Sequence, residues 1–538
     1  MTNIPNTQYA VQLVGPSQVT LNKTKDVTLP GPHQLLARVE CVGLCFSDLK
    51  LLEQFSRHPR KSDVIVGLPP EVLATLPSYV PNEKPTVPGH EVTCRIVDVG
   101  PDVKHHNVGE RVIVQADFRD LRTAGSNGAF GYNFEGALQE YVLMDERVVM
   151  DKTGERFLIP VSDRLSASAA ALVEPWACVE NSYVSPERQM VKAGGIMLVV
   201  SDSAAKQTWW AKQDAPARIV RESPANVASL PNESFDDIIY FGADKTVIET
   251  LNDKLAARGI LNIVLAGRQI GQCVSVGVGR VHYGSTRWIG TTSASPADSY
   301  ANIPATGELR PGDKVAVIGA GGPMGQMHVI RTICSGIPNI EVVCTDVDDA
   351  RLDSLARKAL PLAKANRVTT RMVNTRNTPL TETFRYIALM APVGALVATA
   401  IRDSLPGCLI NIFAGIPAPT KQDLDLDTYI ANRCYMFGTS GSVIRDMKIV
   451  LAKVESGRMD TNCSVDAICG MAGALDGIAA VENRTLAGKI LVYPMLHDLG
   501  LVPLSQMHKH LPTVAAKLAS GSWCKAAEDE LLRTAGKP

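Results

Sequence analysis

An internal repeat constrains the fold of this 538-residue chain more than any other feature of its sequence. Residues 235–267 and 384–415 each read as an apolar strand, a helix, a glycine and a second apolar strand, ending in the similar segments ILNIVLAG and CLINIFAG. Further along, STRWIGTTSAS corresponds to NRCYMFGTSGS at the same offset of 148 residues, with Gly290 matching Gly438. A constant offset over two blocks indicates a duplicated structural unit. Alternating strands and helices predict parallel sheets, so we expect two tandem, doubly wound α/β domains of the Rossmann type.

The second copy begins with a glycine-rich turn between a strand and a helix, in the stretch AVIGAGGPMGQMHVI. In such a turn backbone N–H groups approach a pyrophosphate closely, and side chains would obstruct them. Gly322 and Gly325 fit the second and third glycines of the dinucleotide-binding pattern, while Gly319 or Gly321 serves the tight turn. The turn residues that we expect at the cofactor are Gly319, Gly321, Gly322, Pro323, Met324 and Gly325.

An acidic residue follows this turn at the spacing of a ribose ligand. Asp346 ends the next predicted strand, 21 residues after Gly325. A carboxylate at about this distance binds the ribose hydroxyls and repels a 2′-phosphate. The pattern therefore favours NAD over NADP as the cofactor.

The first copy lacks the glycines that a nucleotide requires. Its first strand, VKAGGIMLVV (191–200), matches LRPGDKVAVIG (309–319) at an offset of about 118, so roughly one βα unit is missing after it. The turn that follows reads VVSDSAAKQTWW and contains no glycine. We therefore expect the first copy to be structural.

Composition excludes several classes of function. The net charge is −1 and the pI is near 6.8, which does not favour binding to nucleic acid or to anionic membranes. No apolar run reaches the ~18 residues of a membrane span, and the N-terminal stretch does not resemble a signal peptide. The twelve cysteines form no CxxC pair and predict reduced thiols. We expect a cytoplasmic protein that acts on small molecules.

Three motifs outside the repeat contain residues that can bind a metal. They are ECVGLCFSDLK (Glu40–Lys50), VPGHEVTCRIVDVG (Val87–Gly100) and LVEPWACVENSY (Leu172–Tyr183). The first two lie in a segment of short Val- and Ile-rich runs broken by Gly and Pro, which predicts a β-rich, barrel-like domain. In this order, and followed by the glycine turn, the motifs resemble the zinc-dependent medium-chain dehydrogenase/reductase family, particularly its polyol (sorbitol-like) dehydrogenases. The resemblance covers about 1–185 and 305–494 and implies a chaperonin-10-like fold for the N-terminal domain.

The resemblance implies one catalytic zinc ion per chain and a role for each motif residue. The implied ligands are Cys45, His90, Glu91 and Glu174, with the nearby Cys178 as the alternative to Glu174. Ser47 is implied to relay the substrate proton, and Asp48 to orient the histidine. Three protein ligands and one open position make a catalytic zinc site, at which an alcohol loses its proton more easily and then passes a hydride to the nicotinamide.

The chain departs from the family pattern in ways that affect the site. The stretch QADFRDLRTAGSNGAFGYNFEGALQEY holds no cysteine where relatives carry a four-cysteine lobe, so we predict no structural zinc. The spacing from Cys45 to His90 is long, and residues 51–80 are expected to form a lip over the substrate cleft. Arg57, His58 and Arg60 of this lip can meet a phosphorylated or acidic substrate, although solvated loop charges are the simpler interpretation.

The expected domains follow from the motifs and the repeat. They are a catalytic domain (1–185, completed by 461–494), a degenerate Rossmann-like domain (186–308), an NAD-binding domain (309–460) and a helical tail (495–538) for packing or assembly. Dimers of the resembled family join nucleotide domains edge to edge, and the first copy can take the partner's place and cover the exposed edge strand. We predict either a monomer with such an intrachain pseudo-dimer or a homo-oligomer formed by other surfaces.

The sequence thus predicts an oxidoreductase that transfers a hydride between NAD and a secondary alcohol of a polyol or sugar, phosphorylated or not. One alternative is a redox-neutral, epimerase-type enzyme that retains its NAD. Another is a non-catalytic binding or scaffold protein in which the degraded copy reflects lost chemistry.

Overall fold

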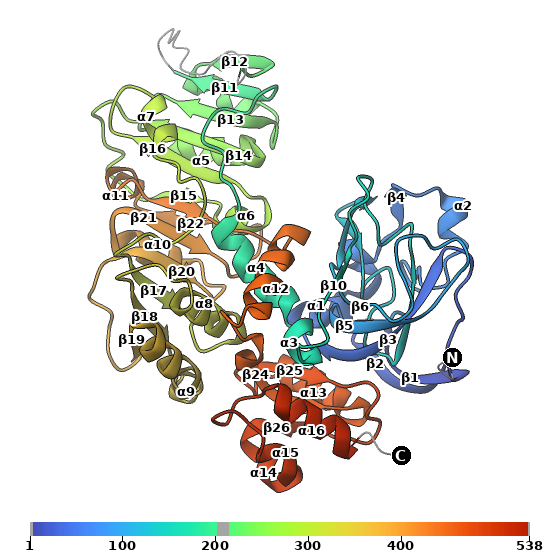
Figure 1. Cartoon of the computed structure of the whole chain (residues 1–538). Helices are drawn as coiled ribbons and strands as arrows, with labels where there is room; N and C mark the ends of the chain where they lie inside the picture. Colours follow the sequence, from blue (N-terminus) through green and yellow to red (C-terminus); the bar gives the residue numbers. More distant parts are fainter. Residues whose placement is uncertain (1–3, 202–214, 536–538) are drawn as a thin grey trace. The chain divides into compact units, whose positions relative to one another are not determined.

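The computed structural model describes residues 4–201 and 215–535, which fall into two compact units (Figure 1). The first unit contains the chain up to Ala177 together with the part from Ser442 onward, and the second contains Cys178–Gly441. The chain passes from the first unit to the second within helix α4 (Val173–Val184). None of the helices in the described ranges has the length and apolar character that a bilayer crossing requires.

The first unit is built on an eight-stranded sheet in which β3 is central. The strand order is β10-β6-β5-β3-β25-β24-β26, and β9 also pairs with β3. The strands are β3 (Gln34–Gly43), β5 (Glu91–Val99), β6 (Arg111–Val114), β9 (Tyr141–Asp145), β10 (Leu158–Pro160), β24 (Val465–Cys469), β25 (Lys489–Val492) and β26 (Val502–Pro503). A hairpin of β1 (Thr7–Gly15) and β2 (Gln18–Asp26) and a small sheet of β4 (Val64–Val66), β7 (Asp117–Thr123) and β8 (Asn127–Ala129) complete this β-rich part, as predicted.

The helices of the first unit include the C-terminal tail. They are α1 (Phe46–Gln54), α2 (Pro70–Leu73), α3 (Ala167–Ala171), α12 (Ile444–Glu455), α13 (Ala474–Glu482), α14 (Met507–His510), α15 (Pro512–Ala515) and α16 (Lys525–Ala535). Glu528 of α16 is buried and accepts hydrogen bonds from the N–H groups of Ala167 and Ser168, at the start of α3, and from the Tyr493 hydroxyl. A carboxylate at a helix N-terminus is stabilising, so the tail packs onto the first unit through a specific cap.

The second unit contains two parallel sheets of matching order. The first copy is β12-β11-β13-β14-β16 and the second is β19-β18-β17-β20-β21-β23. The first-copy elements are β11 (Ile196–Val200), β12 (Arg218–Glu222), β13 (Phe235–Tyr240), α5 (Lys245–Lys254), β14 (Leu255–Val264), α6 (Val278–Tyr283), β16 (Arg287–Thr291) and α7 (Ala297–Ala301). The second-copy elements are β17 (Lys314–Ile318), α8 (Pro323–Ile333), β18 (Glu341–Asp346), α9 (Asp349–Asn366), β19 (Thr369–Asn374), β20 (Phe384–Leu389), α10 (Ala395–Arg402), β21 (Ser404–Ile412), α11 (Leu426–Ala431) and β23 (Tyr435–Phe437).

Aligned on their first strands, the two sheets differ by one edge strand. β11, β13, β14 and β16 take the places of β17, β20, β21 and β23, whereas β19 has no counterpart among the described strands of the first copy. The predicted α/β class with Rossmann-type parallel sheets is confirmed. The glycine-free turn VVSDSAAKQTWW falls mostly outside the described residues.

The two copies pack against each other within the second unit (Figure 1). β15 (Val274–Val276) pairs antiparallel with β22 (Gln422–Leu424), and Ser275 lies opposite Asp423, its equivalent in the repeat. The packing is reciprocal, because Gly290 faces Ile430 while the equivalent Gly438 faces His282. Such exchange of equivalent contacts is the property of an isologous interface. A single hydrophobic core runs through both copies.

Candidate active site

The start of helix α1 places the first group of site residues. Asp48 lies in the first turn, and its Oδ2 accepts a hydrogen bond of 3.0 Å from the backbone N–H of Cys45. This contact, in which an acidic residue at the third helical position reaches back to the N-cap, is a strong helix-start arrangement. It fixes the backbone at Cys45, just after the end of β3, and leaves Asp48 Oδ1 to face the next motif.

His90 lies next to the other carboxylate oxygen of Asp48, Oδ1. Its Nδ1 lies 3.2 Å from Asp48 Oδ1, and the backbone N–H of Gly89 donates to the same oxygen at 3.3 Å. The His90–Asp48 contact is close but not aligned as a hydrogen bond. Burial opposes a charged imidazole here, yet Asp48, with smaller contributions from Tyr132 and Cys45, raises the pKa of His90 well above its usual value. A metal would therefore compete with a proton for Nε2, and its binding would release that proton.

Ser47 lies between the cysteine and the histidine. Its hydroxyl donates to Cys45 Sγ at 3.0 Å and lies 3.2 Å from His90 Nε2. A hydrogen bond with Ser47 also acts on the buried Tyr132, whose pKa is raised, chiefly by burial. The serine hydroxyl is thus positioned at the two candidate ligand atoms and beside a second hydroxyl group.

Glu91 completes the group from the first position of β5. It is fully buried, and its Oε1 accepts a 2.6 Å hydrogen bond from Lys489 of β25. Gly43 is opposite it in the β3–β5 pair, and a Cβ at Gly43 would lie 2.2 Å from Glu91 Oε2. Only glycine leaves room for this carboxylate to turn toward Cys45 and His90.

These three residues form a donor set that suits a metal ion. Ligand atoms of Cys45, His90 and Glu91 all lie within 4.8 Å of one another. Glu91 Oε2 is buried and has no hydrogen-bond partner, although an unpaired buried carboxylate oxygen is costly. Thiolate, imidazole and carboxylate are the ligands that zinc takes in catalytic sites. The residues present therefore fit the predicted zinc ion.

The fourth predicted ligand stands apart from this group. Glu174, on α4, is not among the three residues whose ligand atoms converge. It does act on Lys489: burial opposes the charged form of this lysine, but Glu91 and, to a smaller extent, Glu174 raise its pKa. Cys178 follows on the same helix but belongs to the second unit. The choice between Glu174 and Cys178 stays a prediction.

The glycine turn of the second copy has the geometry of a nucleotide cradle. Gly319 has a φ of 82°, which favours glycine and assigns it the tight turn. A Cβ at Gly325 would lie 2.4 Å from the Gly319 carbonyl oxygen, so Gly325 permits close packing of α8 on β17. At Gly322, the N-cap of α8, a Cβ would meet nothing within 4 Å. Pro323 and Met324 then begin α8 beside this open space, where the helix N-terminus can accept an anionic group.

Asp346, at the end of β18, contacts the glycine turn. Its two carboxylate oxygens accept the backbone N–H groups of Gly321, at 2.9 Å, and of Val347, at 2.8 Å. The carboxylate is therefore fixed at the edge of the glycine turn, where a ribose would lie. Each oxygen keeps a further lone pair for a hydroxyl group.

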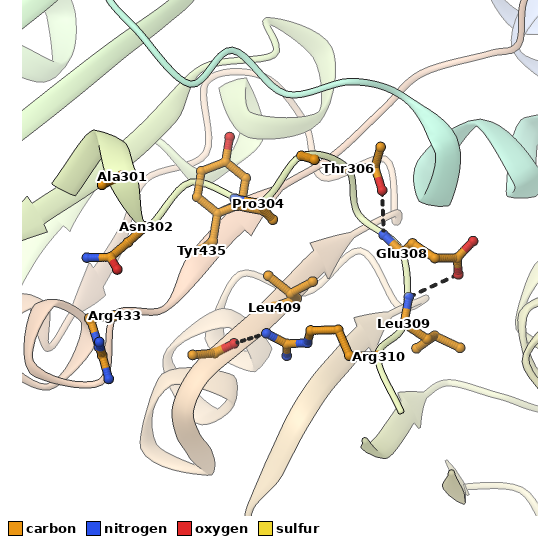
Figure 2. A pocket seen from close by; sticks show the side chains of 12 residues that line it. Ala301, Asn302, Pro304, Thr306, Glu308, Leu309, Arg310, Leu409, Arg433 and Tyr435 are labelled. Atoms are coloured by element: carbon orange, nitrogen blue, oxygen red, sulfur yellow. Dashed lines mark hydrogen bonds between the residues drawn. The ribbon is translucent and has the colours of Figure 1, made fainter. Parts of the chain in front are cut away.

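A pocket of about 580 Å³ opens at the opposite ends of the strands, as Figure 2 shows. Residues 301–310, which lead from the first copy into β17, line it together with the beginnings of β21 and β23. Arg310 donates a hydrogen bond to the Gly407 carbonyl oxygen across it. Because nucleotides bind at the carboxyl ends of parallel strands, this pocket is not the cofactor site.

Three residues beside the candidate metal ligands were not predicted from the sequence. Gly43, Tyr132 and Lys489 become visible only through the pairing of distant strands and the packing of the lip. The signal for Lys489 was present in GKILVYP, where a lysine opens an otherwise apolar strand. A buried lysine needs acceptors for its ammonium group, and here one of them is the carboxylate of Glu91.

Comparisons with known proteins identify the type of the N-terminal domain and several related enzymes. Residues 31–154 match the alcohol dehydrogenase GroES-like domain. The (R,R)-butanediol dehydrogenase of Bacillus subtilis is 26% identical over 235 residues, covering 40% of this chain and 61% of that protein. The L-sorbose 1-phosphate reductase of Klebsiella pneumoniae is 24% identical over 349 residues, covering 55% and 78%. The aligned region thus spans less than two thirds of the first of these relatives.

Solved structures show the same fold. The crystal structure of the Bacillus subtilis butanediol dehydrogenase superposes with a TM-score of 0.55 at 15% identity, covering 91% of this chain and all of that one. A Sinorhizobium meliloti protein that carries the name zinc-binding dehydrogenase, solved with NADP, has a TM-score of 0.52 at 14% identity, with coverage of 91% and 100%. The chain thus contains an alcohol dehydrogenase GroES-like domain at residues 31–154, shares the fold of the solved dehydrogenases, and is similar in sequence to polyol dehydrogenases of the medium-chain dehydrogenase/reductase family.

Proposed function

We propose that the protein is a zinc- and NAD-dependent dehydrogenase that transfers a hydride between the nicotinamide and a secondary alcohol of a polyol or sugar. The observation that carries this proposal is the convergence of Cys45, His90 and Glu91, with a buried Glu91 oxygen that lacks a partner. A scaffold protein would have no use for such an oxygen. The family supplies the reaction type, and this donor set supplies the reason to expect a metal.

Each residue of the group has a task in the proposed reaction. Cys45, His90 and Glu91 would hold the zinc ion, which when bound supplies a Lewis acid that favours loss of the alcohol proton. Asp48, 3.2 Å from His90 Nδ1, would orient the imidazole when the metal is bound. The Ser47 hydroxyl, within 3.2 Å of two ligand side chains, accepts the alcohol proton and passes its own outward. Glu174 is proposed as the fourth acid of the site.

The choice of NAD as cofactor is supported by Asp346. Its carboxylate is fixed by two backbone N–H groups and would accept hydrogen bonds from ribose hydroxyls. A 2′-phosphate at the same place would be repelled by this charge. The cofactor turn formed by Gly319, Gly322 and Gly325 would bind the pyrophosphate.

Metal analysis of the purified full-length protein tests the proposal first. We expect one zinc ion per chain, lost in Cys45→Ala and retained in the control Cys273→Ala, because Cys273 is an exposed cysteine of the first copy. Loaded protein should then reduce NAD with polyols or sugars. A protein that binds no zinc would refute the proposal. Zinc together with tightly bound NAD and no net NADH formation would instead indicate the epimerase-type reaction.

The reciprocal contacts of the second unit support an assembly proposal as well. We infer that the first copy occupies the place that a second subunit would take against the second copy, so that the chain is an intrachain pseudo-dimer. Asp427 of the second copy accepts N–H groups of Ile270 and Gly271 of the first, at 2.9 and 2.7 Å. Light scattering and cross-linking test this point. An intermolecular cross-link between β22 segments of two chains would overturn it.

A further inference from the structure

We propose that the lip between Cys45 and His90 forms a binding site for an anionic group on the substrate, built from His58 and Arg60 beside Tyr132. The inference rests on the proposed function and adds a substrate class to it, namely polyols or sugars that carry a phosphate or carboxylate group. The chemistry shared by these groups is an oxyanion some distance from the reacting hydroxyl.

Tyr132 connects the lip to the candidate metal ligands. Its ring centre lies 5.8 Å from that of His90 and 5.1 Å from that of His58. The guanidinium carbon of Arg60 lies 5.6 Å from the same ring centre. A substrate whose alcohol reaches Ser47 would therefore have the basic residues of the lip within the length of a sugar chain.

The lip is anchored and is not a loosely solvated loop. Lys61, which follows Arg60, is fully buried and donates hydrogen bonds to the carbonyl oxygens of Val80 and Lys84. The Asn133 amide, next to Tyr132, donates to the Ser62 carbonyl oxygen at 2.9 Å. These contacts fix the backbone of the residues that follow His58 and Arg60, namely Lys61 and Ser62. A fixed backbone lets charged side chains act as a preformed site.

Two positive charges, those of Arg60 and Lys50, act on His58. Burial, followed by the positive charges of Arg60 and Lys50, lowers the pKa of His58 to about 4. At neutral pH the ring is therefore neutral, and because its Nδ1 accepts the backbone N–H of Arg60 at 3.2 Å, its proton is on Nε2. His58 thus offers a donor where neighbouring cations oppose a further positive charge. An anion would be attracted by the same field.

Arg60 is only partly neutralised. Its Nη2 lies 3.6 Å from Asp117 Oδ2, which is longer than a hydrogen bond. Asp117 is itself held by the side-chain amide of Asn127, at 2.8 Å. The guanidinium group therefore keeps donors for a ligand, and its planar fork matches the geometry of phosphate and carboxylate. A neutral polyol has no negative charge that could pair with the Arg60 guanidinium group.

Two measurements on the zinc-loaded full chain test the inference. In the first, kcat/KM is compared for neutral polyols, the corresponding phosphate esters and the corresponding sugar acids, in wild type, Arg60→Gln and His58→Asn. The control is Arg119→Gln, which removes an exposed arginine of β7, the strand that also contains Asp117. We expect wild type to prefer one anionic series at least tenfold. Arg60→Gln should lose that preference through a higher KM for the anionic substrates.

The second measurement does not depend on turnover. Inorganic phosphate is titrated calorimetrically into wild type, Arg60→Gln and Arg119→Gln. We expect the Kd to rise at least tenfold in Arg60→Gln only, with melting temperature and zinc content preserved. Equal Kd values for the two variants, or equal use of neutral and anionic substrates, would overturn the inference and leave the dehydrogenase proposal standing. Absence of zinc and of all turnover would instead refute the proposed function.

Discussion

Glu91 and Lys489 form a buried ion pair beside the candidate metal ligands, with Oε1 and Nζ 2.6 Å apart although 398 residues separate them in sequence. Lys489 Nζ also donates to the Leu44 carbonyl oxygen at 2.6 Å, just before Cys45. One lysine therefore neutralises one Glu91 oxygen and directs the other toward Cys45 and His90. The pair joins the C-terminal strand β25 to the two N-terminal motifs.

We predict that Lys489→Met destabilises the first unit by about 3–5 kcal/mol, because removing one partner leaves an uncompensated buried charge. The orphaned Glu91 would also bind zinc with altered affinity. Thermal unfolding and zinc content measure the two effects. Lys525→Met is the control, since it breaks the exposed pair with Asp529, which is worth about 0.3–0.5 kcal/mol. Equal melting temperatures of the two variants would contradict the prediction.

We predict that Asp346→Ser weakens the use of NAD more than that of NADP. The substitution removes a charged acceptor worth about 1.5–3 kcal/mol, which corresponds to roughly a 10- to 100-fold loss in kcat/KM with NAD. The same change removes the repulsion of a 2′-phosphate, so the ratio of NADP to NAD use should rise. Steady-state kinetics with both cofactors measure this ratio. Asp348→Ser, at the N-cap of α9, is the matched control. An unchanged ratio would show that Asp346 does not face the ribose.

We predict that His328 contributes to the loss of stability in acid. Burial, and then the charge of Arg331, lowers the pKa of His328 to about 3, whereas an unfolded histidine titrates near 6.5. The unfolded state therefore binds the proton first, and stability falls as the pH decreases from 6.5 toward about 3. The slope from one group is at most about 1.4 kcal/mol per pH unit.

The variant His328→Gln should flatten this acid limb, even though it is less stable at pH 7 because the 2.9 Å contact with the Tyr183 hydroxyl changes. Melting temperatures between pH 4.5 and 7.5 measure the limb. His510→Gln, at an exposed position, should leave it unchanged. If His328→Gln and wild type lost stability in parallel, the buried imidazole would not be the titrating group.

The sequence predicted those features that depend on local patterns. The spacing of Gly319, Gly322 and Gly325 predicts their turn, and Asp346 is predicted from its position at the end of the next strand. The candidate nucleotide-binding residues could therefore be named without knowledge of long-range contacts. Glu91 could be named only through resemblance. Its neighbour Gly43 could not be found at all, because the requirement for glycine arises from the register that places residue 43 opposite residue 91. Long-range pairing of this kind is not encoded in any short window.

The reciprocal packing of the two copies in the second unit, here called the seam, leads to a prediction about the equivalent residues Gly290 and Gly438. A Cβ at Gly290 would lie 2.6 Å from Ile430 Cγ1, and a Cβ at Gly438 would lie 2.6 Å from the Ile412 carbonyl oxygen and 3.0 Å from His282 Cα. We predict that Gly290→Ala and Gly438→Ala each destabilise the second unit by about 1–3 kcal/mol, because added atoms in a packed core force shifts of their neighbours.

Neither variant should change the molecular mass in solution, since the contacts that it disturbs lie within one chain. Thermal unfolding and light scattering measure both properties, with Gly500→Ala as the control because a Cβ there meets nothing within 4 Å. Destabilisation by only one of the two variants would show that the packing is not reciprocal. A change of mass would show that the seam is shared between chains, and the working copy would then need a second molecule to cover its edge.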